Sequence, residues 1–480
     1  MHRRGVLATL GVTLSGGCLE SFQSRSESPP DEFDRSAYAD GFTSHGPWEV
    51  DRCDSAGTGH NPTSRLPTGD VDTAWLRTVD GTIDPRTVPV TDDRFVYVGH
   101  QQSTDVGQRG AVTALEGRTG TREWTTVLKL PTSGDAGADD AGTQTRSQNR
   151  TRNWDTVGGL ARDGETVYVT GHSRRFEVVL LAALDATSGA IDWQVSVPGT
   201  EYCPPVVDAN GVYLPSGRAV SSEVESGDKG GGEPTVNALY AFSHGGTERW
   251  THRFENRKEK GMGNAIPTRN TCIADGIVYT SLTDGRIVAL ETDDGTPRWE
   301  RTILERTESI CDERNGHIAV DGDDDRLYAS ADGRLSAYSR EDGSPLWTLD
   351  VAGGGATRRP PTTLVCREGT IHVGCANTLV AVDPTDGTER WRLEDAAVGE
   401  SLAGTVDGLV SASVSASDSG SGTTVAGIDL AGETQWSVDP RGDSGAEATD
   451  DVNPRVISAH DVVYLAFADG RVYAIGARGD

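Results

Sequence analysis

The sequence predicts an all-β fold in which one four-stranded unit is repeated eight times. Eight tryptophans recur at spacings of 44 to 69 residues, and seven of them follow a glycine by four positions. Short strings rich in Val, Ile and Tyr alternate with a period of two between these tryptophans, and no helical period accompanies them. A unit of this size cannot bury its apolar face alone, so successive units must pack on one another. The repeat tryptophans are Trp75, Trp124, Trp193, Trp250, Trp299, Trp347, Trp391 and Trp436.

Each unit contains the same order of strands and turns. Alternating strings such as "DRFVYV" and "DGIVYT" predict strands with one buried face, and second strands such as "IVALE" follow them. Turns such as "DGTERW" come next, and Asp-Gly between apolar runs predicts a hairpin because glycine accepts the positive φ of the turn. The mean period of about 52 residues accommodates four short strands, which is the size of a propeller blade.

The number of blades follows from two incomplete units. Trp75 lacks the preceding glycine, and residues 469–476 ("DGRVYAIG") have the second-strand pattern without a tryptophan strand after it. These two incomplete units would form one blade if the Trp75 strand joined the C-terminal strands. This pairing would also remove exposed sheet edges. The sequence therefore predicts an eight-bladed β-propeller of four-stranded antiparallel blades, closed between its N- and C-terminal strands. A seven-bladed ring with one decayed repeat is the alternative.

The N-terminal segment carries targeting signals. Residues 1–18 have a charged start, an apolar run and a terminal cysteine, which predicts a signal peptide too short to span a bilayer. Arg3 and Arg4 resemble a twin-arginine export signal, and "LSGGC" resembles a lipobox that would make Cys18 the lipidation site. An ordinary cysteine in a cleaved secretory signal is the alternative for Cys18. Residues 19–46, rich in Ser, Pro and acids, predict a flexible tether, and residues 47–480 form the predicted propeller.

The charge of the chain excludes some partners. There are 73 acidic and 44 basic residues, which gives a net charge of -29. Such a charge keeps a protein soluble in high salt and argues against binding nucleic acid or anionic lipid through the propeller surface. The acid excess, with arginine preferred over lysine, resembles that of halophilic archaeal proteins. This resemblance would place an exported chain at the outer face of the cytoplasmic membrane. We expect a monomer that contacts the membrane through its lipid anchor only.

The cysteines and histidines predict no catalytic or metal site. Six cysteines remain after the signal peptide, so an exported chain could form three disulfides in many connectivities, and isolated buried thiols are the other reading. Their spacings contain no CxxC pattern, which argues against a zinc site. The histidines are scattered and no nucleophile elbow occurs, so serine-histidine catalysis finds no support. The six cysteines are Cys53, Cys203, Cys272, Cys311, Cys366 and Cys375.

The repeats resemble the tryptophan-docking motif of quinoprotein (PQQ-like) propellers. The match is closest in "LVAVDPTDGTERW" (residues 379–391), and the resemblance covers about residues 47–476. It implies a girdle in which each tryptophan packs against the neighbouring blade together with a glycine and an alanine. The alanine role falls on Ala114, Ala183, Ala289, Ala337 and Ala381. Residues 50–62 ("VDRCDSAGTGHNP") resemble the lead-in segment of BamB-like lipoproteins.

The family contains two kinds of protein. Quinoprotein dehydrogenases hold PQQ with calcium over the propeller axis and often have adjacent cysteines, whereas no two cysteines are adjacent here. Calcium takes about six to eight oxygen ligands, and the acidic string at residues 321–326 ("DGDDDR") reads more simply as a hairpin tip. We therefore expect an exported, lipid-anchored, non-catalytic scaffold that binds a protein or small ligand at the cell surface, without cofactor or metal. A PQQ-dependent dehydrogenase with calcium is the alternative.

The predicted binding site lies at one mouth of the central channel. The loops that lead into the first strand of each blade meet there. They carry Asp155, Glu201, Tyr202, Asn264, Arg314, Arg359, Glu400 and Asn453. The two arginines would anchor an anion, because a guanidinium pairs a carboxylate at two points. A mouth that is merely wet and polar is the alternative.

Three inserts lengthen individual repeats. Residues 131–153, 216–234 and 411–423 are rich in Gly, Ser and Asp and predict surface loops. Asn149, in the first of them, lies in a usable sequon and is a possible glycosylation site.

Overall fold

The computed structural model describes most of residues 47–477, all of which belong to one compact unit, Asp34–Asp480. The positions outside the described residues in this range are 51, 105–106, 131–153, 174–175, 218–236, 257–264, 303–316, 322–324, 332, 352–362, 368, 376–377, 395, 397, 399–400, 418–419 and 441–453. The described residues form strands and connecting turns without a helix. None of them therefore forms a helix long and apolar enough to cross a membrane.

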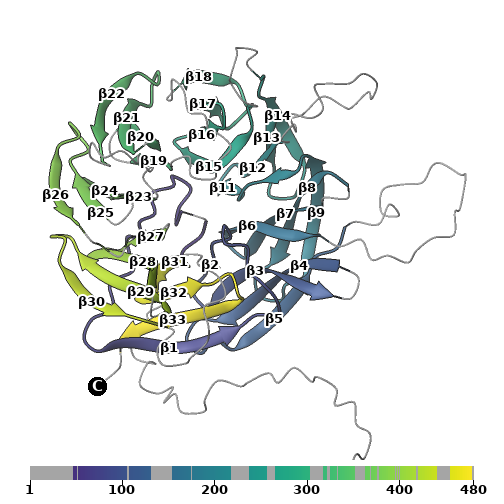
Figure 1. The fold of residues 1–480 in the computed structure, drawn as a ribbon. Coiled ribbons are helices and arrows are strands. Elements are labelled where there is room, and N and C mark those ends of the chain that lie inside the picture. Colours follow the sequence, from purple (N-terminus) through teal and green to yellow (C-terminus); the bar gives the residue numbers. More distant parts are fainter. Residues whose placement is uncertain are drawn as a thin grey trace, which may run out of the picture. The chain divides into compact units, whose positions relative to one another are not determined.

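Eight antiparallel sheets surround a common axis, and we number them as blades 1 to 8 (Figure 1). Blade 1 contains β2 (Val90–Thr91), β3 (Phe95–Thr104), β4 (Gly107–Glu116) and β5 (Arg122–Val127). Blade 2 contains β6 (Thr156–Asp163), β7 (Thr166–Ser173), β8 (Val178–Asp185) and β9 (Ile191–Pro198). Blade 3 contains β10 (Glu201–Tyr202), β11 (Val206–Asp208), β12 (Gly211–Gly217), β13 (Ala238–Phe242) and β14 (Glu248–Arg253). Blade 4 contains β15 (Pro267–Ala274), β16 (Ile277–Leu282), β17 (Arg286–Glu291) and β18 (Pro297–Thr302).

The second half of the ring repeats this order. Blade 5 contains β19 (Ile318–Asp321), β20 (Arg326–Ala331), β21 (Arg334–Ser339) and β22 (Pro345–Asp350). Blade 6 contains β23 (Thr363–Arg367), β24 (Thr370–Cys375), β25 (Thr378–Val382) and β26 (Glu389–Leu393). Blade 7 contains β27 (Ser401–Gly404), β28 (Gly408–Ser417), β29 (Gly420–Asp429) and β30 (Thr434–Val438). Blade 8 contains β31 (Arg455–Ala459), β32 (Val462–Ala466), β33 (Arg471–Ala477) and β1 (Val71–Thr78). The innermost strand of each blade lies nearest the axis and, from blade 1 round to blade 8, contacts that of the next blade (Figure 1).

The ring closes within blade 8. Strand β1 pairs antiparallel with β33, and the register places Trp75 opposite Ala474 and Arg77 opposite Val472. The N-terminal strand thus completes a sheet whose other three strands come from the C-terminus. The predicted eight-bladed propeller with this closure is confirmed, and the seven-bladed alternative is excluded.

Tryptophans join successive blades at the outer turns. Trp299 of blade 4 donates its Nε1–H to the carbonyl of Arg340 in blade 5, at 2.9 Å. A Cβ built on Gly343 in the same turn would lie 2.7 Å from Cε3 of that indole, so the turn packs on the ring only with glycine, whose φ is 69°. Equivalent bonds of 2.8 to 3.0 Å run from Trp75, Trp124, Trp193, Trp250, Trp347 and Trp391 to the carbonyls of Gly117, Ala186, His244, Thr292, Pro384 and Leu430.

Two local features differ from the sequence expectation. Residues 411–423 were expected to form a surface loop, but β28 and β29 pair without interruption from Gly408 opposite Asp429 to Ser417 opposite Gly420. The string "SASVSAS" has a period of two, and backbone pairing needs no large side chains, so the hairpin extends through it. In blade 3 the inner strand is divided into β10 and β11 around Pro204 and Pro205, because proline has no N–H to donate to a ladder.

Candidate functional site

A segment that precedes the first blade strand crosses the centre of the ring. Residues 47–66, which we call the axial segment, lie among the innermost strands before the chain reaches β1 at the outer edge of blade 8 (Figure 1, purple). The segment contains residues 50–62, whose sequence resembles the lead-in of BamB-like lipoproteins. Its path makes it part of the channel wall.

Six backbone hydrogen bonds and one from the Asn61 side chain tie the axial segment to the inner strands in the order of the blades. Described residues of blades 1, 2, 4, 5, 6, 7 and 8 take part. The bonds run from Thr91 N to Trp48 O (2.7 Å), Arg162 N to Glu49 O (2.6 Å), Ile273 N to Ser55 O (2.6 Å), Val320 N to Ala56 O (2.9 Å), Cys366 N to Thr58 O (2.8 Å), Gly404 N to Gly59 O (2.8 Å) and Asn61 Nδ2 to Ser458 O (3.0 Å). The inner strands are sheet edges, and these bonds satisfy backbone groups that would otherwise stay open.

The axial segment lies towards one end of the ring. Its partners Ile273, Val320 and Cys366 lie near the C-terminal ends of β15, β19 and β23. The loops that lead into the inner strands lie at the N-terminal ends of the same strands, so these backbone contacts lie towards the end opposite the predicted mouth. Close approach requires glycine at position 59, where φ is 67° and a Cβ would lie 3.1 Å from the carbonyl oxygen of Leu364.

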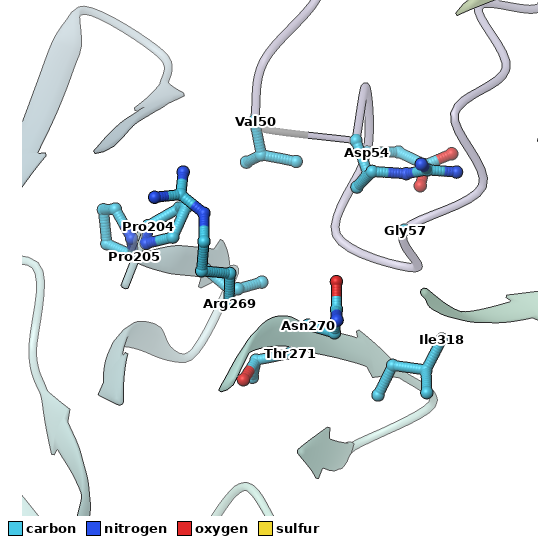
Figure 2. Close-up of a pocket in the computed structure, with 11 residues that line it drawn as sticks. Val50, Asp54, Gly57, Pro204, Pro205, Arg269, Asn270, Thr271 and Ile318 are labelled. Carbon is cyan, nitrogen blue, oxygen red and sulfur yellow. The ribbon is translucent and has the colours of Figure 1, made fainter. Parts of the chain in front are cut away.

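A pocket lies between the axial segment and the beginnings of the inner strands (Figure 2). Its space for a water-sized molecule is about 20 Å³, and the pocket is partly open to solvent. The axial segment contributes Val50, Arg52, Asp54 and Gly57, blade 3 contributes Pro204, Pro205 and Val206, blade 4 contributes Arg269, Asn270 and Thr271, and blade 5 contributes Ile318. The pocket is therefore lined by polar and apolar side chains in equal number.

Arg269 reaches from blade 4 across the channel. Its Nη2 donates to the carbonyl of Arg86, which precedes β2 of blade 1, and to the carbonyl of Gly158 in β6 of blade 2, at 3.4 Å. Its Nη1 is buried and has no hydrogen-bond partner among the described residues. The guanidinium lies between Pro204, Pro205 and Val50 in Figure 2. The side chain thus links three blades and still has unused donor capacity.

Arg52 and Asp54 place charge on the opposite wall of the pocket. Nη1 of Arg52 lies 2.7 Å from Nδ1 of His317 and 3.4 Å from Oγ1 of Thr363, at the beginnings of the inner strands of blades 5 and 6. Asp54 accepts hydrogen bonds from N and Oγ1 of Thr58, at 3.0 and 2.5 Å. Burial raises the pKa of Asp54, although the Thr58 bonds oppose that shift. The Asp54 carboxylate is thus held by its own turn.

The structure describes three of the eight predicted mouth residues. Asp155 is half-buried, and its backbone N–H donates to the carbonyl of His172 at 2.9 Å. Glu201 and Tyr202 form β10, where they pair with Gly217 and Ser216. Asn264, Arg314, Arg359, Glu400 and Asn453 lie outside the described residues. The convergence of these eight side chains remains a prediction.

Sequence reasoning missed the residues that line the axial pocket. Arg269 and Asn270 stand in an inner strand, "PTRNTC", where a charged side chain must face the channel or a neighbouring blade. That departure from the apolar pattern was a usable signal. Arg52 had no such signal, because the axial segment is not part of the repeat.

The other sequence predictions have mixed outcomes. Among the described cysteines, Cys53, Cys203, Cys272, Cys366 and Cys375 are all buried and none is joined to another. Burial raises the pKa of Cys53 well above its ordinary value, so this thiol is poorly reactive. Cys18, Asn149 and Cys311 lie outside the described residues, as do residues 322–324 of the acidic hairpin tip.

The described residues around the axis do not by themselves fit a calcium-PQQ centre. Among the pocket-lining side chains, Asp54 is the one carboxylate beside Arg52 and Arg269, whereas calcium takes about six to eight oxygens. Within the described part of the chain no group of three His, Cys, Asp or Glu residues could hold a metal ion.

Comparison with known proteins places the fold. The profile of the family described as outer membrane protein assembly factor BamB matches residues 108–331 and 235–419. BamB from Moraxella catarrhalis is 15% identical, with 85% of this chain and 100% of that chain covered and a TM-score of 0.52. A europium-containing methanol dehydrogenase is 13% identical, with 90% of this chain and 98% of that chain covered and a TM-score of 0.57. Quinohemoprotein alcohol dehydrogenase from Comamonas testosteroni is 14% identical, with 94% and 83% covered and a TM-score of 0.57.

The structural likenesses, at identities this low, show a shared fold. A search of curated proteins finds no match. The family profile, however, spans more than half of the sequence. The chain therefore belongs to the PQQ-like propeller family described as outer membrane protein assembly factor BamB.

Proposed function

We propose that this protein is an exported, lipid-anchored and non-catalytic propeller that serves as a binding scaffold for a protein or small ligand. The observation that carries the proposal is the axial segment, which is hydrogen-bonded to the inner strands of seven blades. A scaffold needs a rigid ring, and this segment ties seven blades together.

Two further observations support a binding role. The family description names an assembly factor, which favours a protein partner. The described lining of the pocket contains two guanidinium groups and a single carboxylate. It therefore offers hydrogen-bond donors for an anion rather than the oxygen ligands of calcium. The net charge of -29 disfavours nucleic acid as the partner.

Cofactor content tests the non-catalytic role. We expect protein purified from its source organism to contain neither PQQ nor calcium at a one-to-one ratio, measured by chromatography of the extracted quinone and by elemental mass spectrometry. Addition of PQQ with calcium should not produce dye-linked alcohol oxidation. Stoichiometric PQQ, or activity that depends on added PQQ, would instead assign the protein to the dehydrogenases.

A further inference from the structure

We infer that residues 61–92 form a belt that locks blade 8 into the ring, so that this closing blade opens only when the whole ring unfolds. Among the described sheets, blade 8 alone is assembled from two distant parts of the chain. The pairing of β1 with β33 would by itself leave a seam that can open locally. The inference concerns this seam and does not depend on the proposed binding role.

The belt begins at the end of blade 8 that carries the β31–β32 turn. Nδ2 of Asn61 donates to the carbonyl of Ser458 at 3.0 Å, and the hydroxyl oxygens of Ser64 and Ser458 lie 3.0 Å apart. The backbone N–H of Arg65 donates to Oδ1 of Asp461 at 2.7 Å. Asn61, Ser64 and Ser458 are almost fully buried. Buried groups cannot exchange these bonds for bonds to water unless the structure opens, so the bonds hold this end of the blade.

The belt then follows the outer edge of blade 8 and crosses its other end. Strand β1 pairs with β33 along the outer edge (Figure 1, purple and yellow). Beyond β1, the backbone N–H of Val79 donates to the carbonyl of Gly470 at 2.9 Å, and that of Ile83 donates to the carbonyl of Ala468 at 3.0 Å. A Cβ built on Gly470 would lie 2.2 Å from the carbonyl oxygen of Gly81, so the β32–β33 turn and the belt are in direct contact.

The last part of the belt contacts the inner strand of blade 8 at both of its ends. Nε of Arg455, which begins β31, donates to the carbonyl of Pro85 at 2.5 Å. Nε2 of His460, which follows β31, lies 2.6 Å from the carbonyl oxygen of Asp92. The belt therefore meets blade 8 at its outer edge, at both turns and at both ends of its inner strand.

Apolar side chains join the belt and blade 8 in one core. Leu66, Val79 and Ile83 of the belt are buried in the same hydrophobic cluster as Val456 and Tyr473 of the blade. Removal of the C-terminal strands would expose this cluster together with the hydrogen-bonding groups of the belt. Residues 61–66 are also the last part of the axial segment, which is bonded to the inner strands of seven blades. Opening at the seam would therefore spread round the ring.

Native-state hydrogen exchange, followed by mass spectrometry, tests the lock on the full mature chain in urea below the unfolding transition. We compare the slowest amides of β32 in blade 8 with those of β16 in blade 4, on the other side of the ring. Both sets should exchange with the same free energy of opening and the same dependence on urea, because both need global unfolding. A lower free energy and a weaker urea dependence in β32 would show that the seam opens locally, and would overturn the inference.

Asn61→Ala weakens the belt without a change in β1. The variant loses the bond to Ser458 and the bonds that Oδ1 accepts from the N–H groups of Thr63 and Ser64. Exchange should become at least about tenfold faster, and by the same factor in β32 and β16. Asn210→Ala, in an exposed turn of blade 3, is the matched control and should change neither rate. Acceleration confined to β32 would contradict the lock, and the urea series of the parent decides the question if Asn61→Ala does not fold.

Discussion

Trp436 lies directly over Gly427 of its own blade: a Cβ built on Gly427 would stand 2.3 Å from Cε2 of the indole. The equivalent position opposite the tryptophan in blade 4 is an alanine, Ala289 opposite Trp299. Nε1 of Trp436 is buried and has no partner among the described residues. The cause is the ring closure. In blade 8 the outer pair β33 and β1 is made from two distant parts of the chain, so no turn joins them to offer a carbonyl and a glycine.

Gly427→Ala should therefore destabilise the ring. The added methyl group collides with the Trp436 ring, and overpacking of this kind costs about 1 to 3 kcal/mol. Chemical denaturation of the purified variant gives the change in the free energy of unfolding. Gly427→Ala combined with Trp436→Leu is the control, because the smaller side chain should recover most of the loss. A neutral single variant would contradict the close packing.

Trp299→Ala should cost about 3 to 5 kcal/mol, the usual loss for a large buried aromatic. Trp299→Phe isolates the hydrogen bond to Arg340, because phenylalanine keeps much of the contact and loses the N–H. We expect Trp299→Phe to cost about 1 kcal/mol more than Trp436→Phe, since Trp436 gives up no such bond. Equal losses in the two phenylalanine variants, measured by urea denaturation, would argue against a role of the indole N–H.

Gly59→Ala should loosen the axial segment. Alanine at a φ of 67° is strained, and its Cβ would crowd the carbonyl of Leu364. We expect faster hydrogen exchange at the amides of Cys366 and Gly404, which donate to this segment. Gly164→Ala is the matched control, since Gly164 also has a positive φ but no atom within 4 Å of the added Cβ. Unchanged exchange at both amides would show that the segment does not depend on this glycine.

His372 should make the protein sensitive to acid. The imidazole is fully buried against Trp391, and burial, aided by Arg367 and His60, lowers its pKa to about 3. In the unfolded chain the imidazole binds a proton with a pKa near 6.5. Above that pH the histidine is neutral in both states, so protonation takes nothing from the free energy of unfolding. As the pH falls from 6.5 towards 3, the unfolded chain takes up this proton and the folded chain does not, so the free energy of unfolding falls by about 1.4 kcal/mol per pH unit.

Replacing His372 tests this contribution. Tyrosine occupies the equivalent position in other blades, as Tyr97 does, where its hydroxyl donates to Oδ2 of Asp92 at 2.5 Å and lies 3.2 Å from the carbonyl oxygen of Ala186. His372→Tyr should reduce the slope of unfolding free energy against pH by up to one proton, and His372→Phe should do the same without a new hydrogen bond. His60 and His100, whose pKa values burial lowers to about 4, would continue to titrate. A slope equal to that of the parent in both variants would refute the assignment.

Cys18→Ser should release the protein from the membrane or leave an unprocessed precursor. Serine cannot form the thioether that attaches lipid, and the signal segment is too short to act as a permanent anchor. Fractionation of cells that express the variant, with mass spectrometry of the N-terminus, gives the answer. Cleaved protein that stays in the membrane fraction would refute lipid anchoring.

The sequence by itself determined the ring. Glycine and tryptophan recur four residues apart because each blade must present the same turn to the indole of its neighbour, and a requirement that repeats is visible as a period. The closure could be predicted for the same reason, since the Trp75 strand and the strand of residues 469–476 each lacked what the other supplied. Local turn chemistry and period-two strands account for the rest of the blades.

Only the tertiary structure shows which residues lie at the centre of the ring. The axial segment occurs once, and its partners lie in blades whose residues are up to about 400 positions away, so no local pattern records its path. The pocket follows from that path, because Val50, Arg52 and Asp54 meet Arg269 only after the ring has closed. Repetition made the scaffold predictable from sequence, whereas the channel depends on contacts that each occur a single time.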